Sequence, residues 1–338
     1  MSKPKTRRDI PMVAVQEFED IHFTSRDGLR LYGRHYRPKV ASDARPVVCL
    51  AGLTRNSRDF HDVAVALSQG AKARDVFTLD TRGRGLSEYD SDWKNYAVPI
   101  EMQDAIDFMM MLGLRNAGII GTSRGGLISM VLAAAQPSLM GAVVLNDIGP
   151  VIEQDGLARI AGYVGRIPQP KNWADAARII GDLFRRDFPQ MTDDDFAAIA
   201  RQMFNDKDGK PVGAYDPKLA RCLSVLDGPI PKLWPQFEAM KRIPVLVLRG
   251  ENSDLLSEKT VEEMRQRHPK LSSFTVSAQG HAPLLRDEQT ISAVASFFAE
   301  TDEQNDGTRY GILSRSDFGH VSRLVSTSPL STRRENSV

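Results

Sequence analysis

This sequence contains, in this order, a serine, an aspartate and a histidine that together could activate a hydroxyl group. Ser123 lies in residues 121–125 (GTSRG), which fit the pattern G-x-S-x-G. A serine hydroxyl is a poor nucleophile near neutral pH unless a base takes its proton, and a histidine with a pKa of about 6.5 suits that task. The flanking glycines allow a strand to turn sharply into a helix with the hydroxyl exposed. The motif alone also fits an ordinary turn that contains a serine.

His281 is the expected base among the six histidines. It follows a glycine in a loop after an apolar strand that ends near Val276, and such loops lie at the carboxyl edge of a parallel sheet. His61, near the start of a helix, could line a pocket, but a partly buried helix residue is the simpler interpretation. Four histidines fit the early hairpin, a helix end or the tail: His22, His35, His268 and His320.

The histidine needs a carboxylate to hold its tautomer and to stabilise its charged form. Asp254 follows the apolar run 245–248 and is the preferred candidate, although it could instead cap the following helix. Asp147, directly after the run 142–145, is the alternative acid, and Glu251 ranks third. The order serine, aspartate, histidine, with each residue after a different strand, favours catalysis much more strongly than the serine motif does.

The negative oxygen that forms when serine attacks a carbonyl requires hydrogen-bond donors already in place. The backbone amide of Arg124, directly after the serine, is one candidate. The other is the amide of Leu53 in the loop after the run 47–50. These two amides are the predicted oxyanion hole.

Apolar runs of the strand type alternate with helical patterns before residue 145 and again after residue 244. This alternation predicts a doubly wound α/β fold. Between them the strand pattern disappears and the spacing is helical. We expect a flexible arm at 1–16, a core domain at 17–149 and 241–301, a helical cap at 150–240 and a mostly disordered tail at 302–338.

These motifs resemble the α/β-hydrolase superfamily over roughly residues 17–300. Besides residues 121–125, the segment 80–87 (DTRGRGLS) is similar to the family's D-x-R-G-x-G-x-S loop, and Gly280-His281 matches its histidine loop. The resemblance implies an α/β fold with a mostly parallel eight-stranded sheet, an inserted helical cap and no cofactor. The sequence departs from the family at Ala51-Gly52, where many relatives have His-Gly. It also departs at Arg124, which could be a solvated residue or a guide for an anionic substrate.

The resulting hypothesis is a serine hydrolase that cleaves a small-molecule carboxylic ester through an acyl-enzyme. A lactonase or C–C bond hydrolase with the same triad is an alternative, and so is a non-catalytic ligand-binding protein on the same fold. Aromatic and methionine side chains of the insertion could line the pocket or pack its own core: Tyr163, Trp173, Phe184, Met203, Phe204, Trp234 and Phe237.

The amino-acid composition limits the kinds of partner that we expect for this protein. Lys and Arg number 44 against 43 Asp and Glu, so the net charge of +1 gives no argument for nucleic acid or an anionic membrane. No apolar run approaches the roughly 20 residues that span a bilayer. Cys49 and Cys222 fit buried thiols of a reducing compartment. We expect a cytoplasmic protein without a metal, acting on a small ester or lactone, and the sequence leaves its oligomeric state open.

Overall fold

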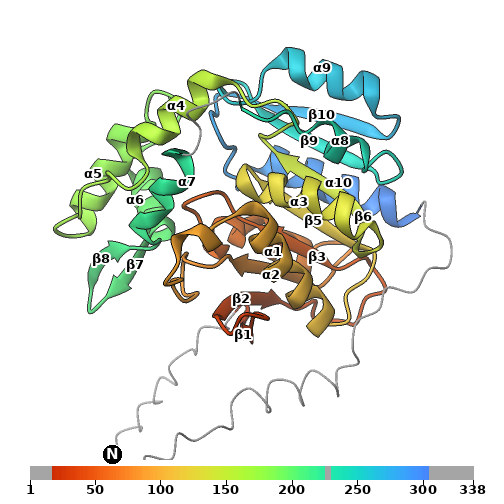
Figure 1. Ribbon diagram of the computed structural model, residues 1–338, viewed down its shortest axis with the longest axis horizontal. Coiled ribbons are helices and arrows are strands. Elements are labelled where there is room, and N and C mark those ends of the chain that lie inside the picture. Colours follow the sequence, from red (N-terminus) through yellow and green to blue (C-terminus); the bar gives the residue numbers. More distant parts are fainter. Residues whose placement is uncertain (1–16, 225–229, 304–338) are drawn as a thin grey trace, which may run out of the picture.

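The apolar run Val47–Leu50 forms strand β3, and its side chains are fully buried. A strand buried on both faces needs helices on both sides of its sheet. The computed structural model, which describes residues 17–224 and 230–303, has helices packed on each face of one large sheet (Figure 1). The expected arm at 1–16 and the expected tail beyond residue 303 lie outside the described residues.

The sheet has eight strands in the order β1-β2-β4-β3-β5-β6-β9-β10. Strand β2 is antiparallel to both of its neighbours, β1 and β4, and the remaining pairs are parallel. The predicted mostly parallel eight-stranded sheet is therefore confirmed. The other strands are β1 (Glu19–Thr24), β2 (Arg30–Tyr36), β4 (Val76–Asp80), β5 (Ala117–Thr122), β6 (Met140–Asn146), β9 (Val245–Gly250) and β10 (Leu271–Val276).

Two layers of helices cover the sheet. Apolar residues of α1 (His61–Gln69) and α10 (Glu288–Glu303) form one buried cluster with the sheet. The opposite cluster includes residues of α2 (Val98–Met111), α3 (Arg124–Ala135), α8 (Trp234–Glu238) and α9 (Glu258–Arg267). Helix α8 lies within the range expected for the cap, yet it packs on α3. Helix α10 likewise continues two residues past the expected end of the core.

The insertion between β6 and β9 contains helices and one element that the helical pattern did not predict. Residues 204–213 form a two-stranded antiparallel sheet, β7 (Phe204–Lys207) and β8 (Lys210–Gly213). Asp208 and Gly209 connect the strands, and both have positive φ, as two-residue hairpin turns require. The insertion's longer helices are α4 (Gln154–Tyr163), α5 (Trp173–Phe184) and α6 (Asp193–Met203), followed by the short α7 (Arg221–Ser224).

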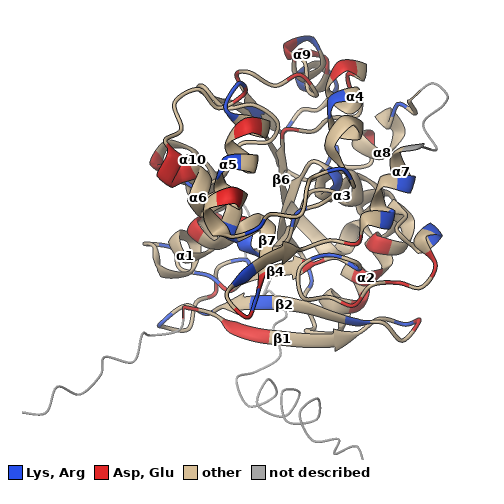
Figure 2. Cartoon of the chain, turned by 90° about the vertical axis from the view of Figure 1, so that its left-hand side faces the viewer, with Lys and Arg blue, Asp and Glu red and all other residues tan. Residues whose placement is uncertain are grey.

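The insertion has an apolar core of its own, formed mainly by α5, α6 and the start of β7. Figure 1 shows it as a green lobe beside one end of the sheet. In Figure 2, basic and acidic segments alternate over the elements that face the viewer, in keeping with the net charge of +1. Among the described residues, no helix has the length and apolar character needed to cross a membrane.

Candidate active site

Ser123 lies in the turn between β5 and α3 with a φ of 51°. Few residues with a side chain adopt a positive φ, so the surrounding backbone must hold this conformation. Glycine makes the turn possible, because a Cβ on Gly125 would lie 1.9 Å from the carbonyl oxygen of Leu50, and a Cβ on Gly121 would lie 2.7 Å from the carbonyl of Gly125. The first turn of α3 therefore lies directly against the ends of β3 and β5.

A chain of two hydrogen bonds leads from Ser123 into the protein. The Oγ of Ser123 is 2.9 Å from Nε2 of His281, and Nδ1 of His281 is 2.8 Å from Oδ2 of Asp147. A carboxylate only accepts, so Nδ1–H donates to Asp147, and Nε2 is left to accept the serine proton. This tautomer is the one that a general base requires.

Asp147 is fully buried, and three groups donate to its carboxylate. The backbone amide of Gly250 donates to Oδ1 at 2.8 Å, while Oδ2 accepts from Ser253 Oγ at 2.6 Å and from the ring of His281. These donors satisfy a charge that would be costly to bury alone. Ser253 was not singled out from the sequence, which gives no local sign of this contact.

The preference for Asp254 as the partner of the histidine is wrong. Asp254 forms two hydrogen bonds with Arg159 of α4, at 2.5 and 2.8 Å. Burial would raise the pKa of Asp254, but Arg159 outweighs it and holds that pKa below its usual value. The alternative residue, Asp147, lies beside His281 because β6 is the immediate neighbour of β5, whereas β9 is one strand further away.

The other acid and base candidates lie elsewhere. Glu251 accepts a hydrogen bond from the amide of Ala278. His61 contacts the hydroxyl of Tyr36 and the carboxylate of Glu17. Neither residue takes part in the hydrogen bonds that connect Ser123, His281 and Asp147.

The two predicted amide donors belong to segments that meet at Ser123. Leu53 lines the same cavity as Ser123, and a Cβ on its neighbour Gly52 would lie 3.8 Å from the Cβ of Ser123. Arg124 is the first residue of α3, where amide groups have no acceptor within the helix. Arg84 holds the Leu53 loop by donating from Nε to the Leu53 carbonyl at 2.8 Å.

The side chain of Arg124 fits neither of its expected roles. It is 14 % exposed and turns toward α2, where Nε donates to Glu101 at 2.5 Å and Nη2 donates to the carbonyl of Tyr96 at 2.7 Å. It is thus neither a solvated residue nor a free cation that could guide an anionic substrate.

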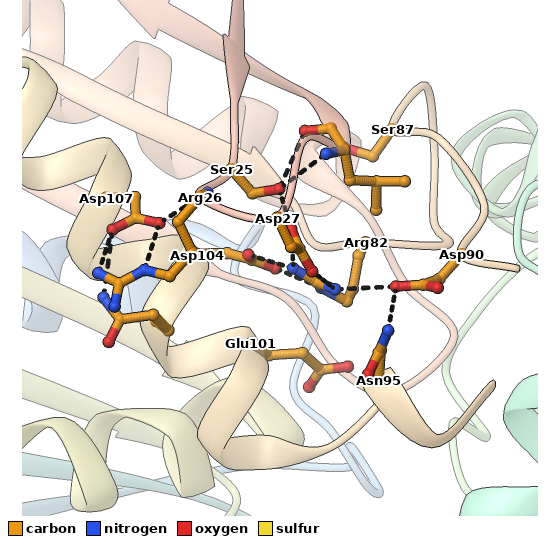
Figure 3. Close-up of polar contacts among 12 residues, drawn as sticks. Ser25, Arg26, Asp27, Arg82, Ser87, Asp90, Asn95, Glu101, Asp104 and Asp107 are labelled. Carbon is orange, nitrogen blue, oxygen red and sulfur yellow. Dashed lines mark hydrogen bonds and ion pairs between the residues drawn. The ribbon is translucent and has the colours of Figure 1, made fainter. Parts of the chain in front are cut away.

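The segment 80–87 that resembles the family's loop is held by buried ion pairs. Arg82 is surrounded by carboxylates of Asp27, Asp90 and Asp104, at 2.6 to 2.9 Å (Figure 3). Gly85 has a φ of 59°, and a Cβ there would lie 1.9 Å from Oδ2 of Asp80. Asp80, Arg82 and Gly85 of the loop motif therefore each have a structural role.

A cavity of about 90 Å³ opens beside Ser123 and His281. Its walls are mostly apolar, and the insertion contributes three of the expected residues, Tyr163, Phe184 and Met203. Arg55 and Asp59 add a charged pair with contacts of 2.6 and 2.7 Å. The other residues expected at the pocket pack elsewhere: Trp173 and Phe204 in the insertion's core, and Trp234 and Phe237 against the sheet's helices. In the part of the chain that the structure describes, no cluster of His, Cys, Asp or Glu could hold a metal ion.

The fold and the glycine-flanked serine turn define the class of α/β hydrolases. The sequence model of the family described as "alpha/beta hydrolase fold" matches residues 45–288. The chain therefore belongs to the α/β-hydrolase family.

Three relatives illustrate this membership. The chain is 35% identical over 266 residues to a 3-hydroxybutyrate-oligomer hydrolase of Cupriavidus necator, covering 76% of this chain and 89% of that protein. It is 27% identical over 252 residues to a 2-(acetamidomethylene)succinate hydrolase of Mesorhizobium japonicum, covering 73% and 85%. The crystal structure of an α/β hydrolase from Novosphingobium aromaticivorans superposes with a TM-score of 0.77 at 37% identity, covering 84% and 98%. The family and the relatives named as hydrolases identify the chain as a hydrolase.

The geometry predicts opposite results for two aspartates. Asp147→Asn should lower kcat by about 10²–10⁴-fold, because the histidine loses the acceptor that fixes its tautomer. Asp254→Asn should leave kcat within about threefold, since Asp254 binds Arg159. Steady-state kinetics on a p-nitrophenyl ester would measure both, and the larger loss in Asp254→Asn would contradict the observed pairing.

The glycine contacts predict a large stability difference. Gly125→Ala should lower the free energy of unfolding by about 3 kcal/mol or more, because the added methyl group meets backbone atoms of β3. Gly162→Ala is the matched control: Gly162 is an exposed residue of α4 with open space around it, and alanine should stabilise the helix by about 0.5–1 kcal/mol. Chemical denaturation would compare them, and equal stabilities of the two variants would contradict the described packing.

Proposed function

We propose that this hydrolase cleaves carboxylic esters with a small acyl group through an acyl-enzyme on Ser123. The observation that carries the proposal is the continuous hydrogen-bond chain from Ser123 through His281 to the buried Asp147, with distances of 2.9 and 2.8 Å. Such a chain converts a serine hydroxyl into a nucleophile.

In the first half-reaction, His281 Nε2 takes the proton of Ser123 while Oγ forms a bond to the ester carbonyl carbon. The electron pair of the C=O bond moves to oxygen, and the amides of Leu53 and Arg124 stabilise that charge. The intermediate then collapses, the ester C–O bond breaks, and His281 gives its proton to the leaving alcohol. Asp147 accepts the hydrogen bond from Nδ1–H and stabilises the charged histidine throughout.

In the second half-reaction, a water molecule attacks the acyl carbon and gives its proton to His281. The bond from the acyl carbon to Ser123 Oγ breaks, and the proton returns to the serine. The products are a carboxylic acid and the free enzyme.

The size of the cavity supports a small acyl group. At roughly 10–15 Å³ for each water-sized group, a cavity of about 90 Å³ accommodates on the order of six to nine such groups. This is sufficient for a four-carbon acyl chain, and it is consistent with the 3-hydroxybutyrate-oligomer hydrolase among the relatives. The charged pair Arg55–Asp59 offers both a donor and an acceptor in an otherwise apolar wall, which suits a substrate hydroxyl.

We further infer that the insertion acts as the cap that selects the substrate. In support, Ile160, Tyr163, Phe184 and Met203 all belong to it and line the cavity together with residues of the core domain. Pockets between two structural units are common places for substrate selection.

Replacing the nucleophile tests the reaction class. Ser123→Ala should lose about 10⁴-fold or more in kcat on p-nitrophenyl butyrate while keeping its melting temperature, because the hydroxyl takes part only in chemistry. A fluorophosphonate probe should label the wild type and not the variant. Substantial turnover by a folded Ser123→Ala protein would exclude the proposed mechanism.

Enlarging the pocket tests the acyl preference. The wild type should favour butyrate over octanoate p-nitrophenyl esters, and Met203→Ala should shift kcat/KM toward the longer chain by about tenfold, because it removes part of the cavity wall. Met264→Ala is the control, since Met264 is fully buried in the core cluster away from the cavity. It should lose stability without changing the chain-length profile; an identical shift in both variants would contradict the assigned pocket.

A further inference from the structure

One buried carboxylate connects the two segments that carry the proposed oxyanion donors. Glu101 lies in the first turn of α2, and its side chain is completely buried. Oε1 accepts from Nη1 of Arg84 at 2.5 Å, and Oε2 accepts from Nε of Arg124 at 2.5 Å. A single acidic side chain therefore holds two guanidinium groups.

Each of these arginines also fixes the backbone at the site. Arg84, itself fully buried, donates from Nε to the carbonyl of Leu53 at 2.8 Å and thereby orients the loop after β3. Arg124 donates from Nη2 to the carbonyl of Tyr96, and this bond ties the start of α3 to the segment before α2. Its own amide is the second proposed donor.

The charges of the three side chains do not cancel. One carboxylate and two guanidinium groups leave a net charge of +1 in a buried region that adjoins Ser123. Burial would raise the pKa of Glu101, but Arg124 and Arg84 outweigh this effect and keep the pKa below its usual value, so the carboxylate stays ionised. The ionised carboxylate can therefore hold both guanidinium groups through charge-assisted hydrogen bonds.

Stability alone does not account for such a cluster. Buried ion pairs lose much of their Coulomb energy to desolvation, and apolar residues of similar volume often serve stability as well or better. The contact of both arginines with the donor segments is the feature that an apolar replacement could not supply.

We propose that Glu101 is a positioning residue: through Arg84 and Arg124 it fixes the Leu53 and Arg124 amides relative to each other, and so holds both proposed donors in place for the oxyanion. This inference rests on the proposed function, because it assumes that an oxyanion forms at Ser123. Because the oxyanion forms in the transition state, replacing Glu101 should change kcat more than it changes substrate binding.

A matched pair of variants on one helix tests the inference. Glu101→Gln keeps the shape of the side chain and removes its charge. Asp104→Asn does the same one turn further along α2, where the carboxylate of Asp104 accepts from Arg82 at 2.6 and 2.7 Å (Figure 3) rather than from Arg84 or Arg124. Both changes disturb a buried ion pair in neighbouring parts of the structure.

Glu101→Gln should lower kcat on p-nitrophenyl butyrate by about 10- to 100-fold, with KM within about threefold of the wild type. A trifluoromethyl ketone, which adds to the serine to give an oxyanion, should bind more weakly by a similar factor. Asp104→Asn should keep kcat within about twofold, whatever its melting temperature. If Asp104→Asn lost as much kcat as Glu101→Gln, or if folded Glu101→Gln kept wild-type kcat, the inference would be overturned.

Two further variants cover the case in which Glu101→Gln does not fold. Arg84→Lys and Arg124→Lys keep the positive charge but replace a planar fork of donors by a single ammonium group, so each should lower kcat and ketone affinity together. Wild-type values in both would overturn the inference. Ser123→Ala distinguishes a failure of the proposed function from a failure of this inference. If Ser123→Ala stayed active, the proposed function itself would be wrong. If activity depended on Ser123 but not on Glu101, only the positioning role would be refuted.

Discussion

The contact between the first turn of α3 and the end of β3 is the constraint on which the site depends. Gly125 has no side chain, and the space a Cβ would need is occupied by the carbonyl of Leu50. This contact brings the first turn of α3, which directly follows Ser123, against the strand that leads into Gly52 and Leu53. Nucleophile and both proposed donors are thereby placed by backbone packing, which is more rigid than any arrangement of long side chains.

Buried charged groups then orient the side chains whose positions the backbone alone does not determine. The carboxylate of Asp147 accepts from Gly250, Ser253 and His281, so the histidine ring is held by a group that is itself held at several points. Glu101 is held in a comparable way by hydrogen bonds from Arg84 and Arg124. In both cases a fully buried acid orients another group and is itself hydrogen-bonded on both oxygens.

The sheet, the serine turn and the histidine loop could be predicted because their signals are local. Apolar runs mark strands buried on both faces, and glycines at fixed offsets mark the sharp turn at Ser123. The choice between Asp147 and Asp254 could not be made in this way, because both follow parallel strands and both preserve the chain order. The deciding contact is that of Asp254 with Arg159, which lies 95 residues away in the insertion.

Arg124 and the small sheet of the insertion illustrate the same limit. The partner of Arg124, Glu101, belongs to a different helix, and nothing in the residues around the serine indicates it. The hairpin β7–β8 did have a local signal, the Asp208-Gly209 pair typical of tight turns, but the helical spacing of the preceding segment concealed it. Long-range partners, rather than weak propensities, account for most of what the sequence did not predict.

In the proposed mechanism, Ser123 carries the acyl group during turnover. The most direct measurement is rapid acid quenching of the enzyme during hydrolysis of p-nitrophenyl butyrate, followed by mass spectrometry of the intact protein and of its peptides. We expect a butyryl adduct on the peptide that contains Ser123, formed within the first turnover and lost as substrate is exhausted. Turnover without any adduct, or an adduct confined to a different residue, would contradict the account.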